Sequence, residues 1–329
     1  MFTRRDFLAM GATGLASIAP APWQTARSQA IRNSARMLVG FSAGGSVDFV
    51  ARLLVNEMRT YAPSFIVENR PGATGRIAMD ALKNSTADGS AMILTPASII
   101  TLFPYIYKSL NYDAFHDVIP VTSVCSFPYL FSVGPMVPGD VKTLADFIGW
   151  CRANPSKATY GTPGPGSPLH FTGLMLARMA EFEFTHVPYQ GGPPAVQNLL
   201  GGQIAATILP VDNTLAYVKS GNLRALVTTG PQRTALLADV PTIKEAGFAA
   251  LEATEWFGVF VPAKTPEKTV DHLNVTIRET LTKAEVKAGL AKLAYEIADT
   301  SRSDFDGMIK SDFERWGPIV RATGFAPEN

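Results

Sequence analysis

Strand-like and helix-like segments alternate along most of this chain, and this alternation limits the possible folds more than any other feature. A first series contains, in order, a strand over residues 36–41, a helix over 47–62, a strand over 65–70, a helix over 76–83 and a strand over 91–96. The same rhythm returns between residues 158 and 229. Such repetition is typical of βαβ units in a parallel sheet, so the sequence predicts an α/β protein.

Two extended, β-rich segments connect the two series. Residues 118–135 lead from the first series to the second, and residues 251–266 return the chain. A length of 329 residues also favours two domains. We therefore expect two α/β lobes, with a cleft at a hinge that two strands cross and with the helices of residues 267–324 packed on the first lobe. The predicted ranges are 31–130 with 254–329 for lobe one, and 131–253 for lobe two.

The first thirty residues have a different character. Arg4 and Arg5 precede Phe7 and Leu8, a weakly apolar run rich in Gly and Ala, and small residues toward Ala30. This order is typical of a twin-arginine export signal, and the run is too short and too poor in Leu, Ile and Val for a membrane anchor. We expect residues 1–30 to be removed and the mature protein to reach a bacterial periplasm. Removal takes away three arginines and one aspartate, so the formal net charge changes from +1 to −1.

Charge and cysteine content exclude some classes of partner. A net charge near zero argues against nucleic acid and against a basic membrane-binding surface.

An oxidising compartment would permit a bond between Cys125 and Cys151, but Cys151 shares an apolar helical face with Leu144 and Phe147. We expect two buried free thiols, and their pairing stays an open alternative.

Glycine-rich loops follow the first strand of each series, at residues 41–48 and 160–170. In open α/β sheets, ligands bind outside the carboxyl ends of strands. Each loop leads into a helix, whose N-terminus offers unpaired N–H donors and a positive partial charge. Neither loop reads G-x-G-x-x-G or contains Gly-Lys-Ser/Thr, so a nucleotide is not expected. The two loops together predict a site that clamps a small carboxylate or phosphate.

A hydrolase is the alternative that the residues themselves allow. Ser167 and His170, with Ser46 and Asp48, supply the residue types of a catalytic triad. The G-x-S-x-G elbow is missing, and residues three apart at a helix start usually cap the helix. His116, His186 and His272 show no metal-ligand spacing. We therefore expect no catalysis, no metal and no cofactor.

From about residue 36 onward the chain resembles the periplasmic solute-binding receptors of tripartite tricarboxylate transporters, often called Bug receptors. The matching motifs, in order, are FSAGGSVDFVARLL, VENRPGATG, ADGSAMIL, HVPYQGGPPAVQNLLGGQI, GNLRALVTTGPQRTALLADVPTIKEAG, WFGVFVPAKTP and FERWGPIVRATG. The resemblance implies a two-lobed periplasmic-binding-protein fold of type II-like topology. It also implies that a monomer captures a small organic acid and delivers it to the large and small membrane subunits of a transporter. A ligand sensor for a signalling partner would use the same lobes and stays an alternative.

The same resemblance implies which residues bind the ligand carboxylate. They belong to the two strand–helix loops and are Phe41, Ser42, Ala43, Gly44, Gly45, Ser46 and Asp48, and Thr162, Pro163, Gly164, Gly166, Ser167 and His170. Residues 68–70 are expected to fix a turn. The chain departs from the family's usual pattern at Ala205 and Leu209, where acids are common, and at Pro165 and Glu255. These departures leave the distal end of the ligand, and hence its identity, open.

Overall fold

The structure is a computed structural model that describes residues 34–323 and 325, so the predicted export signal lies outside the described residues. The strands are β1 (Ser34–Val39), β2 (Ser64–Asn69), β3 (Ala91–Pro96), β4 (Val118–Val133), β5 (Thr159–Thr162), β6 (Thr185–Pro188), β7 (Ala206–Pro210), β8 (Arg224–Thr228), β9 (Thr254–Pro262) and β10 (Glu296–Ile297). The helices are α1 (Ser46–Glu57), α2 (Arg76–Lys83), α3 (Ser98–Thr101), α4 (Phe103–Ile106), α5 (Leu144–Ala153), α6 (Pro168–Met179), α7 (Gly192–Leu200), α8 (Val211–Lys219), α9 (Glu267–Thr282), α10 (Ala284–Lys292) and α11 (Arg302–Thr323).

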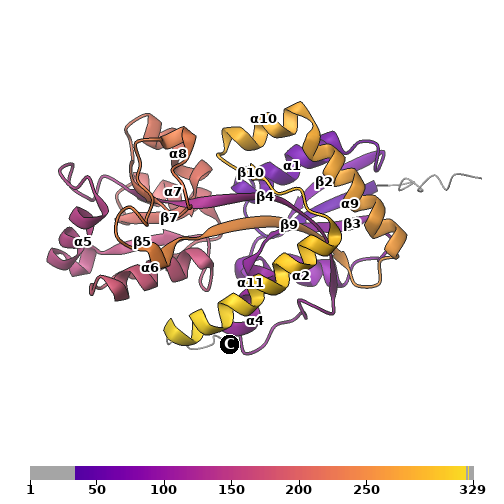
Figure 1. Cartoon of the computed structure of the whole chain (residues 1–329), viewed down its shortest axis with the longest axis horizontal. Coiled ribbons are helices and arrows are strands. Elements are labelled where there is room, and N and C mark those ends of the chain that lie inside the picture. The colour runs from indigo at the N-terminus through magenta and orange to yellow at the C-terminus, as the bar shows by residue number, and fades with distance from the viewer. Residues whose placement is uncertain (1–33, 324, 326–329) are drawn as a thin grey trace, which may run out of the picture.

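The strands form two lobes joined by the long strand β4 (Figure 1). The strand order is β2-β1-β3-β9-β4-β7-β5-β6, and β8 and β10 pair with β4. Residues 118–128 of β4 pair with β9 in what we call lobe one, with β1, β2 and β3. Residues 129–133 of β4 pair with β7 in what we call lobe two, with β5, β6 and β8. The division of the chain at residues 130 and 253 stays a prediction, because β4 passes between the lobes without a break.

Both lobes repeat one parallel arrangement of three strands. In lobe one, the first strand β1 lies between β2 and β3, and in lobe two β5 lies between β6 and β7. The first strand is therefore central in each lobe, and the chain leaves it toward opposite sides of the sheet, which creates a crevice at its carboxyl end. The loops after β1 and β5 thus occupy equivalent positions, as the alternation of segments predicts.

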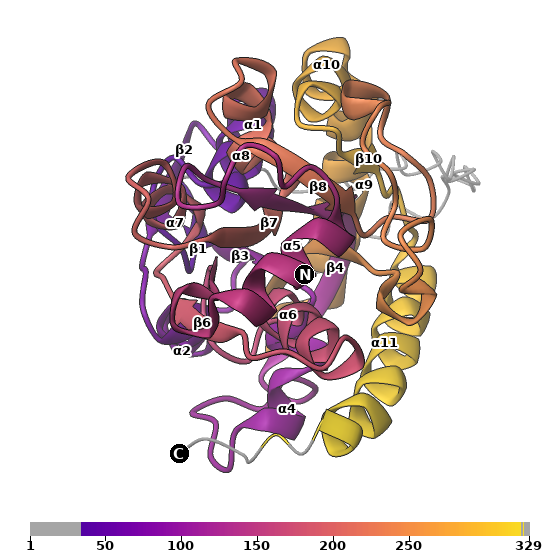
Figure 2. The same ribbon diagram turned by 90° about the vertical axis from the view of Figure 1, so that its left-hand side faces the viewer.

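The C-terminal helices α9, α10 and α11 pack mainly on lobe one. Helix α9 packs on β4 and α1, and α10 packs on α1. Helix α11 contacts β4, α3 and α4 and runs along the lower edge of the molecule in Figure 1, and Figure 2 shows its length from the side. Its Trp316 ring also lies 6.2 Å from the ring of Phe171 in α6. Helix α11 therefore touches lobe two as well.

Several elements differ from the sequence-based prediction. Helix α1 ends at Glu57 and not near residue 62, because the backbone of Met58 leaves the helical conformation with φ −99° and ψ 29°. The helical stretch over residues 267–293 is divided into α9 and α10 at Lys283, whose backbone is extended with φ −66° and ψ 142°. The short helices α3 and α4 follow β3 and were not predicted, because four-residue helices carry too little periodicity to detect.

Aromatic side chains fill the region between the lobes. The Phe127 ring lies 4.5 Å from that of Phe257 and 4.3 Å from that of Tyr295, centroid to centroid. The hinge is therefore a packed aromatic layer, and it forms one wall of the cavity described below.

Cys125 and Cys151 are separate, buried thiols, and burial raises the pKa of Cys151 to about 12. Of the helices that the structure describes, none is both long and apolar enough to span a bilayer.

Candidate functional site

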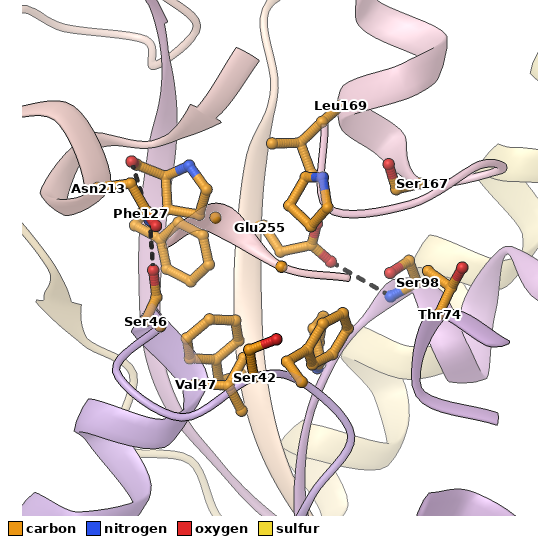
Figure 3. Close-up of a pocket in the computed structure, with 18 residues that line it drawn as sticks. Ser42, Ser46, Val47, Thr74, Ser98, Phe127, Ser167, Leu169, Asn213 and Glu255 are labelled. Carbon is orange, nitrogen blue, oxygen red and sulfur yellow. Dashed lines mark hydrogen bonds between the residues drawn. The ribbon is translucent and has the colours of Figure 1, made fainter. Parts of the chain in front are cut away.

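A cavity lies between the lobes, at the carboxyl ends of their parallel strands (Figure 3). Its volume is about 50 Å³, so the two lobes leave little space between them in this arrangement. Its wall comes from the loops after β1, β2, β3, β5, β6 and β7 and from β4 and β9: Phe41, Ser42, Gly45, Ser46, Val47, Thr74, Pro96, Ser98, Phe127, Pro163, Ser167, Leu169, Gly191, Gly192, Pro210, Asn213, Glu255 and Phe257. This is the crevice that the strand order predicts.

The loop after β1 contributes Phe41, Ser42, Gly45 and Ser46 to the cavity wall. Gly45 is the N-cap residue of α1 and has an extended backbone with φ −84°, so it lines the cavity without a left-handed conformation. The Ser42 hydroxyl donates to the backbone oxygen of Gln190 in lobe two at 2.6 Å. This loop therefore contacts both the cavity and the opposite lobe.

Ala43, Gly44 and Asp48 belong to the same loop but do not line the cavity. Gly44 has φ +79° and is exposed, so its role is to turn the chain. The buried Asp48 accepts bonds from the Gly44 N–H at 2.9 Å, Arg52 Nε at 2.9 Å and Asn69 Nδ2 at 2.9 Å. Burial alone would raise the pKa of Asp48, but these bonds outweigh it and hold that pKa below its usual value. Asp48 thus locks the loop from behind.

The loop after β5 contributes Pro163 and Ser167 to the wall, whereas Thr162, Gly164, Gly166 and His170 lie behind it. The Ser167 hydroxyl donates to the Gly164 oxygen at 3.0 Å and accepts from the His170 N–H at 3.2 Å, so it caps α6. His170 Nδ1 accepts from the Gly166 N–H at 3.1 Å. The two side chains are engaged with backbone groups and not with each other, which is the bonding of a helix cap and not of a nucleophile and base.

His170 stacks on a second histidine that supports the same loop. The ring centroids of His170 and His186 lie 3.9 Å apart, and His186 Nε2 lies 2.7 Å from Thr162 Oγ1. Burial lowers the pKa of His170 to about 4 and, together with its neighbour, that of His186 to about 3. Both rings are therefore neutral at neutral pH, and they brace the loop from outside the cavity.

Four helix N-termini give the cavity its electrostatic character. The N-cap residues of α1, α6, α7 and α8 all line it: Gly45, Ser167, Gly191 and Pro210. Aligned peptide dipoles place a positive partial charge at each such end. Of the described residues that line the cavity, none is Lys, Arg or His. A bound anion would therefore be stabilised by backbone dipoles and N–H groups and not by a basic side chain.

Several lining residues were not assigned to the site from the sequence. Gly191 and Asn213 follow β6 and β7, so applying the strand-end rule to every parallel strand would have found them. Thr74 lies in the turn that was expected to be architectural, and its φ of +52° places it in the left-handed region that a non-glycine residue rarely adopts. Such outliers cluster at ligand sites.

Glu255 is the single acidic side chain in the cavity wall as described. The residue is 4% exposed. Its Oε1 accepts from the Ser98 N–H at 3.2 Å, and its Oε2 accepts from the Tyr129 hydroxyl at 2.7 Å. Burial raises the pKa of Glu255 to about 7. The departure noted in the sequence thus places a carboxyl group inside the cavity.

Asp212 is a second acid, half-buried where the lobes meet. Ser46 Oγ donates to its Oδ1 and Oδ2 at 3.0 and 2.8 Å, and the Tyr295 hydroxyl donates to Oδ1 at 2.6 Å. Burial raises the pKa of Asp212 to about 6. Since Ser46 belongs to lobe one and Asp212 to lobe two, this bond holds the lobes together. Among the described residues, no group of His, Cys, Asp or Glu is arranged to hold a metal ion.

Comparison with known proteins places this geometry in a family. Residues 50–325 match the family described as "Tripartite tricarboxylate transporter family receptor". The chain is 33% identical to protein BugT of Bordetella pertussis (strain Tohama I) over 292 residues, which is 88% of this chain and 89% of that protein.

Solved structures give the same result. The periplasmic binding protein BugD superposes with a TM-score of 0.85 at 26% identity, covering 90% of this chain and 99% of that one. The R. palustris protein Rpa4515 with adipate gives 0.85 at 29% identity, covering 93% and 100%. MatC from Rhodopseudomonas palustris with bound malate gives 0.81 at 26% identity, covering 88% and 99%. The predicted fold class is confirmed, and the family is one of binding proteins and not of enzymes. This chain belongs to the tripartite tricarboxylate transporter receptor family, whose members are periplasmic solute-binding proteins.

Proposed function

We propose that this receptor captures a small organic carboxylate between its two lobes and delivers it to the membrane subunits of a tripartite tricarboxylate-type transporter. The observation that carries this proposal is the cavity onto which four helix N-termini open while its described wall holds no basic side chain. Two relatives were solved with adipate and with malate, both small carboxylates. A carboxylate accepting backbone N–H groups from both lobes would stabilise the closed arrangement.

Within the two predicted loops, we assign direct ligand contact to the members that line the cavity. These are Phe41, Ser42, Gly45, Ser46, Pro163 and Ser167. Ala43, Gly44, Asp48, Thr162, Gly164, Gly166 and His170 would support those contacts from behind. Thr74, Ser98, Gly191 and Asn213 are added to the contacting set, since they line the same cavity.

A thermal-unfolding screen of the mature protein against organic acids tests the proposal. A ligand present at a hundred times its dissociation constant should stabilise the fold by about 2.7 kcal/mol. Binding should be one to one, and the acid should be recovered unchanged. Consumption of the acid that disappears in Ser167→Ala would instead favour the hydrolase alternative. A screen in which no organic acid shifts the transition would reject the proposal.

Export by the twin-arginine route is the second part of the proposed function. Arg4 and Arg5 are read by a receptor, so changing both to Lys should leave the protein in the cytoplasm although the charge is kept. Periplasmic delivery of the double variant would reject this route. Adjacent genes for a large and a small membrane subunit would favour transport over the role of a ligand sensor.

A further inference from the structure

The position of Glu255 carries an inference about the chemical class of the ligand. Glu255 lies in β9 at the hinge, and Figure 3 shows its carboxyl group at the cavity wall, directed toward Ser98. The residue is 4% exposed, so bulk water does not solvate the carboxyl group. A buried ionised carboxylate without a partner costs several kcal/mol, so its surroundings should reveal how it is compensated.

Two protein groups form hydrogen bonds with this carboxyl group. The Ser98 N–H reaches Oε1 at 3.2 Å, and the Tyr129 hydroxyl reaches Oε2 at 2.7 Å. An ionised carboxylate accepts at both oxygens and keeps further lone pairs, whereas a protonated one needs an acceptor for its O–H. The Tyr129 hydroxyl can also accept, so these contacts fit both forms, and the ionised form keeps lone pairs beyond the two bonds.

Full charge compensation is missing from the surrounding protein. None of the described residues that line the cavity is a cation. The guanidinium of Arg315 lies 3.1 Å from Asp312 Oδ1, and Trp256 Nε1 donates to Asp312 Oδ2 at 2.7 Å. Arg315 is thus engaged by Asp312, which itself carries a negative charge near Glu255. A cation held within the cavity would complete the pairing of Glu255.

The remainder of the cavity suits a group of opposite charge. The N-termini of α1, α6, α7 and α8 supply positive dipole ends, and apolar side chains such as Phe127, Phe257 and Leu169 lie among them. A single ligand with a carboxylate at the helix ends and a cation at Glu255 would satisfy both regions. A second carboxylate beside Glu255 would meet a like charge instead.

We propose that the ligand carries an ammonium group that donates N–H bonds to Glu255, so that this receptor takes an amino acid and not a simple dicarboxylate. The inference rests on the proposed function, since the helix N-termini must hold the ligand carboxylate. Glu255 then selects the ligand by its distal end. In the rival arrangement, Glu255 is protonated and donates its O–H to the second carboxylate of a diacid.

Matched pairs of small acids separate these arrangements. Isothermal titration calorimetry at pH 8 compares L-glutamate with glutarate, L-aspartate with succinate and 4-aminobutyrate with butyrate. Each pair differs by the amino group. The amino member of at least one pair should bind about ten to a hundredfold more tightly, as expected for a hydrogen bond between charged groups. Tighter binding of the diacids, with no pair favouring the amino member, would overturn the proposal.

Variants assign any preference to Glu255. E255Q keeps the volume and one acceptor oxygen, and it should bind both members of each pair alike. Glu255→Asp retracts the carboxylate and should weaken the preference, which keeps the test open if E255Q does not fold. E252Q removes an equivalent charge from an exposed position three residues earlier and should keep the wild-type preference. An unchanged preference in folded E255Q would also overturn the proposal.

Acids that bind without any amino preference would refute this inference alone, whereas no acid binding would refute the proposed function.

Discussion

The hydroxyl of Ser46 in lobe one donates across the cleft to the carboxylate of Asp212 in lobe two, and 2.8 Å separates Ser46 Oγ from Asp212 Oδ2. Asn213 Nδ2 donates back to Ser46 Oγ at 2.6 Å, and the Tyr295 hydroxyl also donates to Asp212. The sequence predicts Ser46 as a ligand residue, and it does line the cavity. Its hydrogen bonds, however, go to the other lobe. Ser46 can therefore act on affinity by stabilising closure.

Replacing Ser46 by Ala should weaken binding about ten to a hundredfold, since a hydrogen bond to a charged group contributes about 1.5–3 kcal/mol. Small-angle scattering with ligand should show a smaller fraction of compact molecules than in the wild type. Tyr295→Phe removes another donor to Asp212, so the two substitutions should be non-additive in a double-mutant cycle. Ser64→Ala, at an exposed serine of the same lobe, is the control. Wild-type affinity and compaction in Ser46→Ala would show that this bond does not stabilise closure.

The two adjacent glycines of the first loop should respond differently to substitution. A Cβ on Gly45 would lie 3.3 Å from the Ser42 oxygen and 3.5 Å from Pro193 Cδ, whereas a Cβ on Gly44 would meet nothing within 4 Å. Gly45→Val should therefore abolish binding, since its side chain takes ligand space and adds overpacking of about 1–3 kcal/mol. Gly44→Ala should cost about 1 kcal/mol of folding stability because of its left-handed backbone, and should bind normally.

Calorimetry and chemical denaturation of both variants check this contrast. Gly45→Val should retain a cooperative unfolding transition. If Gly45→Val binds as the wild type does, the glycine serves only to turn the chain. A loss of binding in Gly44→Ala alone would place the ligand against the exposed side of the loop.

The stacked histidines should make lobe two sensitive to acid. The pKa values of His170 and His186 are lowered to about 4 and about 3 from 6.5 by burial, so the unfolded chain binds protons first. Their contribution to stability is complete above pH 6.5 and is lost as the pH falls through the folded-state values. Protonation of His170 Nδ1 would also break its bond from the Gly166 N–H.

The variant His170→Asn keeps an acceptor but does not titrate. The difference in unfolding free energy between this variant and the wild type should change between pH 6.5 and 4, with the wild type losing more. Ser64→Ala, at an exposed serine of lobe one, should follow the wild-type pH curve. Parallel pH curves for His170→Asn and the wild type would contradict the assignment.

The loops were predictable from local pattern, whereas the hinge residues were not. Small residues directly after an apolar strand mark the end of that strand, so residues 41–48 and 160–170 could be located without any tertiary information. Glu255 and Phe257 lie inside a strand, and alternate side chains of a strand point to opposite faces. Which face meets the cavity depends on the packing of β9 against β4, which no local pattern specifies.

Residue type alone also did not specify which loop members face inward. Asp48 and Ser46 are two residues apart at the start of α1, where an acid and a hydroxyl both suit a ligand site or a helix start. The structure turns Asp48 toward Arg52 and Asn69 and turns Ser46 toward Asp212. These directions follow from the partners on neighbouring elements, so they require the assembled fold.

The two acids at the cleft should contribute less to the stability of the ligand-free protein as the pH rises toward 8. Burial raises the pKa of Glu255 from 4.5 to about 7 and that of Asp212 from 3.8 to about 6, so the folded state holds these protons longer than the unfolded chain. The favourable contribution is complete below the unfolded-state values and is lost as the pH rises through about 6 and about 7. Denaturant unfolding of the wild type and of Glu255→Gln between pH 6.5 and 8 isolates Glu255, because both proteins carry the same histidines and Asp212. Relative to the wild type, Glu255→Gln should gain stability across that interval, and Glu252→Gln should follow the wild-type curve. Equal slopes in Glu255→Gln and the wild type would show that the carboxyl group at the cavity wall is already ionised throughout this range.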